Sequence, residues 1–342
     1  MRFLIAGDTL PGGTFDRDKI SAIHKALEGR DYSITDLLAF NSTEEAHEIR
    51  RGDIKGWFAG QDLKELNRKF IHRVQAFKPD ILVLGSIDMV SLFMFPETIK
   101  RLRWDMSVVC LFGDDEFMLN RHAHWVGRFD KNIAYVKWCA DYYNNIVPGS
   151  TYYMPVGVDF HERDFDKLQC KPEYDAIFVG NPFGNRPELL EAIVSAFRFT
   201  GGIKLAIFGN DKWQDYPKLR EYHKGYLYAD KTGEMIRNSK IVLSPMEDHL
   251  TGAPHMNATI WLAIKEGRLP ICSEYPVLKD YGLERMIPSY RSKKELCEVL
   301  GHYAQASDRE IVARILFEYT KKGFDYVNLF RDMFYYLGKE FA

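Results

Sequence analysis

The sequence lacks the features that would place the chain in several special classes of protein. Five cysteines are spread over 342 residues with no C-x-x-C pair, which argues against a disulfide framework or a structural zinc site and favours a reducing compartment. No stretch approaches the ~18 uninterrupted apolar residues of a membrane-spanning helix, and the start MRFLIAGD is too short for a signal peptide. The net charge is −2, so no overall field attracts nucleic acid or a membrane surface. We therefore expect a cytoplasmic protein without a membrane partner.

Familiar catalytic signatures are missing as well. The sequence contains no GxSxG elbow, no HExxH helix, no kinase motif set and no Walker P-loop. The stretch HAHW at residues 122–125 is a lone HxH pair without a third candidate ligand nearby. A Ser or Cys hydrolase has little support, and no obligatory cofactor or metal is indicated, although a divalent ion stays open.

What the sequence does contain is a repeated unit of an apolar strand, a polar residue at its tip, and a helix. RFLIAGD, DILVLGS and SVVCLFGDD form the strands of a first series, and YDAIFVGN, IKLAIFGND, SKIVLSP and GRLPICSEY form a second. Near-continuous apolar strands alternating with helices predict parallel sheets covered on both faces. We expect an α/β protein with two Rossmann-like doubly wound domains facing across a cleft, at residues 1–160 and 170–322. The aromatic helix at 323–342 is expected to pack back on the first domain.

Open parallel sheets bind ligands at the carboxyl ends of their strands, so polar residues at the strand tips are the candidate site residues. Glycines let a ligand approach the backbone, a helix N-terminus favours an anion, and an arginine neutralises a diphosphate. A turn, a helix cap or a solvated surface charge remains the ordinary alternative for each. The candidates are Gly12 and Gly13 in the loop after the first strand; Asp114 and Asp115; Gly180, Asn181, Gly184 and Arg186; Gly209 and Asn210; and His249, His255 and Asn257.

Five stretches, in their order along the chain, resemble one family. LFGDDEF, YYMPVGVDF, IFVGNPFGNRPELLEAI, KGYLYADKTGEMIRNSKIVLSP and NATIWLAIKEGRLPICSEY resemble the GT-B glycosyltransferases of the CgeB (spore maturation protein) type. More faintly, CLFGDD, LAIFGN and ATIW resemble stretches of phage DNA β-glucosyltransferases, which share the GT-B fold. The first similarity spans roughly residues 80–300.

The resemblance implies transfer of a sugar from a nucleotide-sugar, with a UDP-sugar favoured, to an acceptor hydroxyl. Asp114 would be the general base, which implies inversion but leaves a retaining mechanism open, and Asp115 would be its neighbour. Arg186 would contact the diphosphate, the loop from His249 to Asn257 would cover the sugar, and Lys224 would contact the base edge or a phosphate. The favoured acceptor is a hydroxymethylated pyrimidine in phage DNA, in a bacterium or a phage-infected cell. A glycan, a protein or a small molecule is the alternative.

One departure from the family pattern concerns the ribose of the nucleotide. Both families usually carry an Arg and, three residues later, a Glu in the helix that corresponds to NATIWLAIKEG. This sequence has Thr259 at the position of the Arg and Leu262 at the position of the Glu. Leucine accepts no hydrogen bond. Glu266 or Glu247 could hold the ribose instead. Otherwise the donor is unusual or donor binding is lost. A protein that binds a nucleotide-sugar without catalysis is a further alternative.

Overall fold

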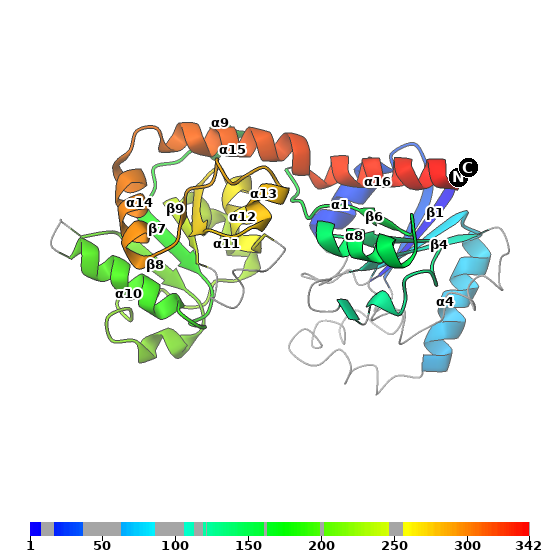
Figure 1. Ribbon diagram of the computed structural model, residues 1–342, viewed down its shortest axis with the longest axis horizontal. Helices are drawn as coiled ribbons and strands as arrows, with labels where there is room; N and C mark the ends of the chain where they lie inside the picture. Colours follow the sequence, from blue (N-terminus) through cyan, green and yellow to red (C-terminus); the bar gives the residue numbers. More distant parts are fainter. Residues whose placement is uncertain are drawn as a thin grey trace. The chain divides into compact units, whose positions relative to one another are not determined.

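The computed structural model describes residues 1–7, 17–36, 63–85, 106–112, 119–120, 122–160, 163–198, 202–245 and 256–341. Contacts divide the chain into two compact units: unit 1 is residues 1–159 with 326–342, and unit 2 is residues 160–325. The chain therefore leaves unit 1, builds all of unit 2, and returns to unit 1 for its last helix. Figure 1 shows this path by colour.

Unit 1 is built on a parallel sheet with the strand order β2-β1-β3-β4-β5-β6. Its strands are β1 (Arg2–Gly7), β2 (Asp31–Asp36), β3 (Ile81–Gly85), β4 (Ser107–Phe112), β5 (Lys131–Ala134) and β6 (Thr151–Tyr153). Every residue of β3 is buried, as uninterrupted apolar strands require when helices cover both faces. Its helices are α1 (Arg17–Ala26), α4 (Leu63–Phe77), α8 (Lys137–Ile146) and α16 (Tyr326–Glu340).

The two faces of this sheet have separate cores because side chains alternate along each strand. On one face, α4 and α8 pack on residues such as Leu82, Val108 and Cys110. On the other face, α1 and α16 pack on Phe3, Ile5 and their neighbours.

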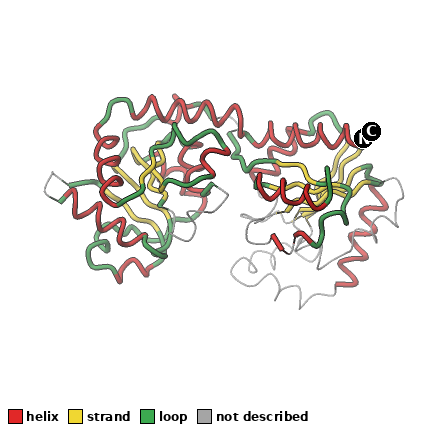
Figure 2. The backbone as a smooth tube through the Cα atoms, viewed as in Figure 1, coloured by secondary structure: helices red, strands yellow, loops and turns green. Residues whose placement is uncertain are grey.

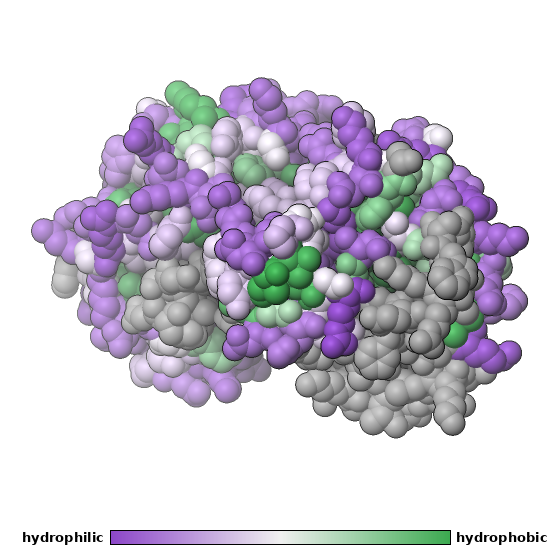
Figure 3. Space-filling view, turned by 45° about the vertical axis from the view of Figure 1, so that its right-hand side comes forward, coloured by the Kyte–Doolittle hydropathy of each residue, from purple (hydrophilic) through white to green (hydrophobic). Residues whose placement is uncertain are grey.

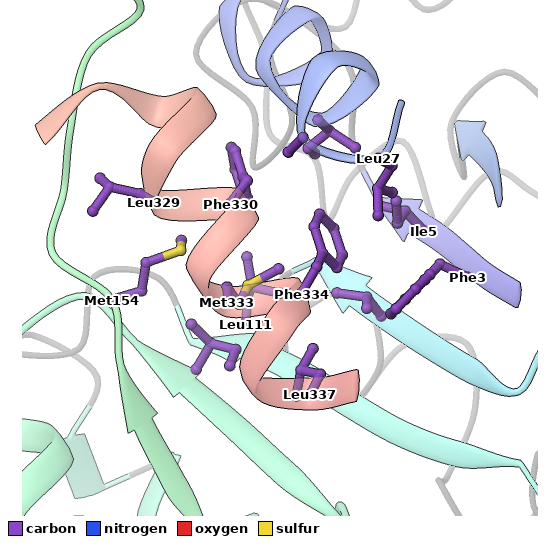
Figure 4. Packing of buried hydrophobic residues seen from close by; sticks show 14 of the residues in the cluster. Phe3, Ile5, Leu27, Leu111, Met154, Leu329, Phe330, Met333, Phe334 and Leu337 are labelled. Atoms are coloured by element: carbon purple, nitrogen blue, oxygen red, sulfur yellow. The ribbon is translucent and has the colours of Figure 1, made fainter. Parts of the chain in front are cut away.

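The last helix, α16, is an integral part of the second of these cores. Phe330, Met333, Phe334 and Leu337 point from it toward the sheet (Figure 4). The rings of Phe334 and Phe3 meet edge to face, with centroids 5.1 Å apart. The apolar residues recur at the three- and four-residue spacing of an amphipathic helix, and α16 lies beside α1 (Figure 1).

Unit 2 has a second parallel sheet, with the strand order β11-β10-β9-β7-β8. Its strands are β7 (Tyr174–Val179), β8 (Leu205–Phe208), β9 (Ser239–Ser244), β10 (Leu269–Ser273) and β11 (Ser289–Tyr290). Its helices are α9 (Phe165–Leu168), α10 (Arg186–Phe197), the 3₁₀ helix η2 (Asp211–Asp215), α11 (Ala229–Arg237), α12 (Ala258–Lys265), α13 (Val277–Asp280), α14 (Lys293–Gln305) and α15 (Arg309–Phe324).

Helices cover both faces of this sheet as well. Helices α10 and α14 pack on one face around Phe178, Ile207 and Leu243, and α11 and α12 pack on the other around Ile177 and Val242. Figure 2 shows the strands of each unit enclosed by helices. The predicted α/β class, with two parallel sheets, is confirmed.

Candidate functional site

The carboxyl edge of the sheet in unit 2 contains a topological switch point between β7 and β9. The chain runs from β7 to β8 on one side, then crosses back to place β9 on the other side of β7. The connections leaving β7 and β9 therefore diverge, and such a divergence opens the crevice where doubly wound sheets bind their ligands. The candidate residues Gly180, Asn181, Gly184 and Arg186 follow β7 directly.

The loops after β7 and β8 are locked together by backbone contact. The carbonyl of Gly180 accepts a hydrogen bond from Nε1 of the buried Trp213 at 2.9 Å, and its amide donates to the carbonyl of Phe208 at 2.8 Å. A Cβ added to Gly209 would lie 2.2 Å from the Gly180 oxygen and 2.7 Å from Trp213 Nε1. Only glycine fits at position 209, because the neighbouring loop occupies the space.

Side-chain hydrogen bonds also connect the loops after β7 and β8, nearer to helix α10. The Oδ1 atom of Asn181 accepts a hydrogen bond from the amide of Asn210 at 3.0 Å, and Asn210 itself caps η2 through the amide of Lys212. Gly184 has φ of 55°, in the left-handed region that glycine adopts without strain. The loop thus has a fixed course from the end of β7 to the start of α10.

Arg186 is held at the first residue of α10 by this loop. Its Nη1 donates to the carbonyl of Asn181 at 3.2 Å, and its guanidinium lies 6.0 Å from the centre of the Phe178 ring. The partial positive charge of a helix N-terminus adds to the charge of the guanidinium. The arrangement is suited to a phosphate group at the end of β7.

Asn257 begins helix α12 on the other side of the switch point. Its Oδ1 accepts a hydrogen bond from the amide of Thr259 at 2.9 Å, which is the usual role of an N-cap asparagine. Its own amide donates to the hydroxyl of Tyr275 at 3.4 Å, and burial raises the pKa of that tyrosine. Asn257 therefore has a structural role at the place where the sequence predicts a ligand contact.

Glu266, which the sequence offered as a substitute ribose ligand, is committed elsewhere. Its side chain is buried and forms ion pairs with Arg237 and, at 3.2 Å, with Arg163. Glu266 caps the C-terminus of the eight-residue helix α12, about 12 Å along the helix axis from its N-terminus. The structure thus overturns Glu266 as a ribose ligand at the carboxyl edge, and Leu262 packs into an apolar cluster.

Lys224 follows a short parallel bridge, between Ile207 and His223, that prolongs the sheet beyond β8. Its Nζ donates to the carbonyl of Glu221 at 3.4 Å. Next along the chain are Tyr226 and Tyr228, which are 63% and 62% exposed and whose ring centroids are 5.1 Å apart. Exposed aromatic rings of this kind can stack on a planar base or a sugar face.

Sequence reasoning missed two further residues at this edge. Trp213 fixes the Gly180 loop, and the signal that could have found it is an indole N–H that needs an acceptor when buried. Ser244 ends β9 at the switch point and is 2% exposed. Its hydroxyl has no hydrogen-bond partner in the part of the chain that the structure describes, so a ligand could satisfy it.

The remaining candidates lie outside the described residues, namely Gly12, Gly13, Asp114, Asp115, Glu247, His249 and His255. Strand β4 ends at Phe112, two residues before Asp114. The ring of the buried His122 stacks on Phe112 with centroids 4.7 Å apart. The assignment of Asp114 as a base stays a prediction.

Metal ligands and membrane segments were sought in the described residues only. No group of three His, Cys, Asp or Glu side chains that could hold a metal ion occurs among them. None of their helices is long and apolar enough to cross a membrane. Figure 3 shows one face on which hydrophilic side chains predominate.

Comparisons with known proteins place the fold. No protein-family model matches the chain, and no curated protein does either. Among solved structures, Anabaena HepE in complex with UDP and glucose matches with a TM-score of 0.64 and 12% identity over 99% of both chains. A glycosyltransferase from Rickettsia africae matches with 0.65 and 11% identity, over 99% of this chain and 98% of that one.

Sucrose-phosphate synthase from Thermosynechococcus elongatus matches with a TM-score of 0.61 and 11% identity, over 100% of this chain and 99% of that one. The chain has the GT-B fold. At such low identity the likeness extends to the fold alone, and the CgeB-like and phage types stay hypotheses.

Proposed function

We propose that the protein is a glycosyltransferase that moves a sugar from a nucleotide-sugar, with UDP-sugars favoured, to an acceptor hydroxyl. The observation that carries the proposal is Arg186 at the start of α10, held by Asn181 at the switch point of a GT-B fold. Departure of a nucleoside diphosphate requires positive charge at its phosphates. HepE, with the same fold, binds UDP, UDP-glucose and glucose, which supports the choice of donor.

In this proposal unit 2 binds the donor. Arg186 and the N-terminus of α10 neutralise the diphosphate. The loops after β7 and β8 form the surface on which it lies, and they contain Gly180, Asn181, Gly184, Gly209 and Asn210. Asn257, His249 and His255 would border the sugar, and Lys224 would contact the base edge or a phosphate. Five free cysteines support a reducing compartment such as the cytoplasm.

Unit 1 supplies the base and the acceptor site. Asp114, next to Asp115, would take the proton from the acceptor hydroxyl, while the hydroxyl oxygen attacks the anomeric carbon and the diphosphate leaves with its electron pair. Attack from the face opposite the leaving group inverts the configuration. The loop with Gly12 and Gly13 would lie on the acceptor side.

The favoured acceptor is a hydroxymethylated pyrimidine in DNA, which would be flipped out of the helix to reach the base. The resemblance of three short stretches to DNA glucosyltransferases supports it. The net charge of −2 opposes it, because DNA binding relies on phosphate contacts. A saccharide acceptor is the second candidate, and the names of sucrose-phosphate synthase and trehalose-6-phosphate synthase among the fold neighbours favour it.

The deciding experiment measures nucleoside diphosphate released from a panel of nucleotide-sugars. Each donor is incubated alone, with DNA containing hydroxymethylated pyrimidines, with unmodified DNA, and with neutral disaccharides. Release that requires the modified DNA supports that acceptor, and release that requires a disaccharide supports the second candidate.

The Asp114→Asn variant tests the catalytic base in the same assay. We expect turnover to fall at least a hundredfold, because general base catalysis contributes about 10²–10⁴-fold, with an unchanged circular dichroism spectrum. Near-normal turnover would contradict the role of Asp114.

A protein that binds the nucleotide-sugar without transferring it is the remaining alternative. Leu262, at the position of the family's ribose-binding Glu, lies in an apolar cluster, and the substitute candidate Glu266 is held in ion pairs, which favours weak or non-catalytic binding. UDP binding without release from any donor or acceptor combination would support this alternative over the transferase.

A further inference from the structure

Unit 2 contains a cavity of about 500 Å³ at the carboxyl edge of its sheet, on the side of α10 and α14. Ser273 and Tyr290, the last residues of β10 and β11, belong to its lining, as does Asn185, which precedes α10. Small-molecule sites in proteins have volumes of roughly 300–1,000 Å³. The cavity is therefore large enough for a small ligand, and no step of the proposed reaction uses it.

The floor of the cavity combines hydroxyl groups with apolar surface. The hydroxyl of Ser273 donates to the hydroxyl of Tyr290 at 3.2 Å. Both residues are buried, as is Leu189 beside them. The edges of a phenol ring and of a leucine side chain give the floor a small apolar area, and the two hydroxyls add groups that both donate and accept hydrogen bonds.

Two ion pairs form the rim. Arg291 binds Glu274 with two hydrogen bonds, of which the one from Nη2 to Oε1 measures 2.9 Å. Lys293 binds Glu188 at 2.6 Å, and hydrogen bonds to these cations lower the pKa of both carboxyl groups. Such exposed pairs hold side chains in place but contribute little to stability, so they can shift to admit a ligand without much loss.

The balance of charge selects the class of ligand. The two carboxylates of the rim cancel its two cations, so an incoming anion would meet as much repulsion as attraction. A neutral molecule with many hydroxyl groups meets acceptors on Glu274 and Glu188 and donors on Arg291 and Lys293. Its apolar face can rest on Tyr290 and its hydroxyls can reach the rim.

We propose that this cavity is a binding site for a neutral saccharide, distinct from the phosphate site proposed at Arg186. Asn185 borders the cavity and is the neighbour of Arg186 in the chain, so the two sites adjoin. The inference rests on the lining of the cavity and not on the proposed transferase reaction.

The test measures binding of maltose, trehalose, lactose and N,N′-diacetylchitobiose to the full chain by saturation-transfer NMR and calorimetry, without nucleotide. The Glu274→Gln variant removes one carboxylate from the rim at an exposed position, where folding is not at risk. Glu298→Gln is the matched control, because Glu298 forms a similar exposed pair with Lys294 on α14 outside the cavity. We expect at least one disaccharide to bind, with about tenfold lower affinity in Glu274→Gln and unchanged affinity in Glu298→Gln.

Inorganic phosphate is the second probe, because Glu274→Gln should change the affinity for an anion in the opposite direction from the affinity for a neutral disaccharide. Removal of the Glu274 charge leaves Arg291 available and should strengthen phosphate binding. Phosphate that binds the wild-type chain more tightly than any disaccharide, and still more tightly in Glu274→Gln, would overturn the proposal. The proposal would also be overturned if none of the four disaccharides bound, or if disaccharides bound Glu274→Gln and Glu298→Gln with equal affinity. Because no nucleotide is present, failure here is distinguishable from failure of the transferase assay.

Discussion

Substitution of Gly209 by alanine is the sharpest test of the close contact between the loops after β7 and β8. The added methyl group would lie 2.2 Å from the carbonyl oxygen of Gly180 and 2.7 Å from Nε1 of Trp213. Both neighbours are fixed, one as backbone and the other as a fully buried indole. The loops must therefore separate by an ångström or more, and the hydrogen bond from Trp213 to Gly180 must lengthen or break.

The expected loss of stability has two parts. Overpacking of a tight site destabilises a protein by about 1–3 kcal/mol, and a buried indole N–H without its acceptor adds about 1–3 kcal/mol. We expect the free energy of unfolding of unit 2 to fall by about 2–5 kcal/mol, depending on how far the loops relax. Affinity for UDP should fall as well, because the displaced loop carries Asn181 and positions Arg186.

Urea unfolding of the full chain, followed by circular dichroism and tryptophan fluorescence, measures the first effect, and calorimetry with UDP measures the second. Gly323→Ala is the control: its added methyl group meets nothing within 4 Å, and alanine favours a helix such as α15 by about 0.5–1 kcal/mol. If Gly209→Ala unfolds within about 0.5 kcal/mol of the wild type, a margin typical of neutral substitutions, the contact between the two loops is not rigid and the reasoning fails.

Three further predictions concern buried or half-buried groups in unit 2. Replacing Glu266 by glutamine removes the charged partner that two arginines share. We expect the free energy of unfolding in urea to fall by an amount toward the lower end of about 3–5 kcal/mol, with UDP affinity unchanged. A large loss of UDP affinity would instead show that Glu266 contributes to nucleotide binding. Burial alone would raise the pKa of Asp175, but its hydrogen bonds with Lys240 and a backbone amide lower it overall, so its stabilisation is complete above pH ~4 and disappears as the pH falls below that. Asp175→Asn should therefore be less stable than the wild type at pH 7, with a difference that shrinks as the pH falls below ~4, and a constant difference would contradict the ion pair. Burial raises the pKa of Cys272 to about 12, so a thiol reagent at pH 8 should label the exposed Cys170 and leave Cys272 unmodified until urea is added, as mass spectrometry of the peptides would reveal.

The fold class was predictable because it depends on patterns that are local in sequence. The stretch YDAIFV, apolar from Ala176 onward, has the pattern of a strand buried on both faces, and it forms β7. Pro187 indicates the start of a helix, and α10 begins at Arg186. Alternating strands and helices then leave few topologies other than a parallel sheet.

The contacts that shape the candidate site depend on distant partners, so the sequence could not reveal them. Glu266 was a reasonable ribose ligand by its spacing in the helix, but Arg163, which is 103 positions away in the chain, holds its carboxylate. Glycine at position 209 suggested a loop that a ligand approaches closely. In the structure it is the carbonyl oxygen of Gly180 that approaches, and it leaves no room for a side chain at position 209. Asp114 and Asp115 follow a strand whose position is described, and their catalytic role stays a prediction from sequence.

The return of the chain to unit 1 also determines the order in which the two units can be completed during synthesis. Unit 2 is one continuous segment, residues 160–325, and all of its strands and helices are synthesised before α16. The sheet of unit 1 is synthesised first, yet one of its faces stays without Phe330, Phe334 and Leu337 until the last residues emerge. The nascent chain thus carries an open apolar face through the translation of a whole domain. Premature termination shortly before residue 326 would leave a finished unit 2 attached to an unfinished unit 1, a natural substrate for chaperones.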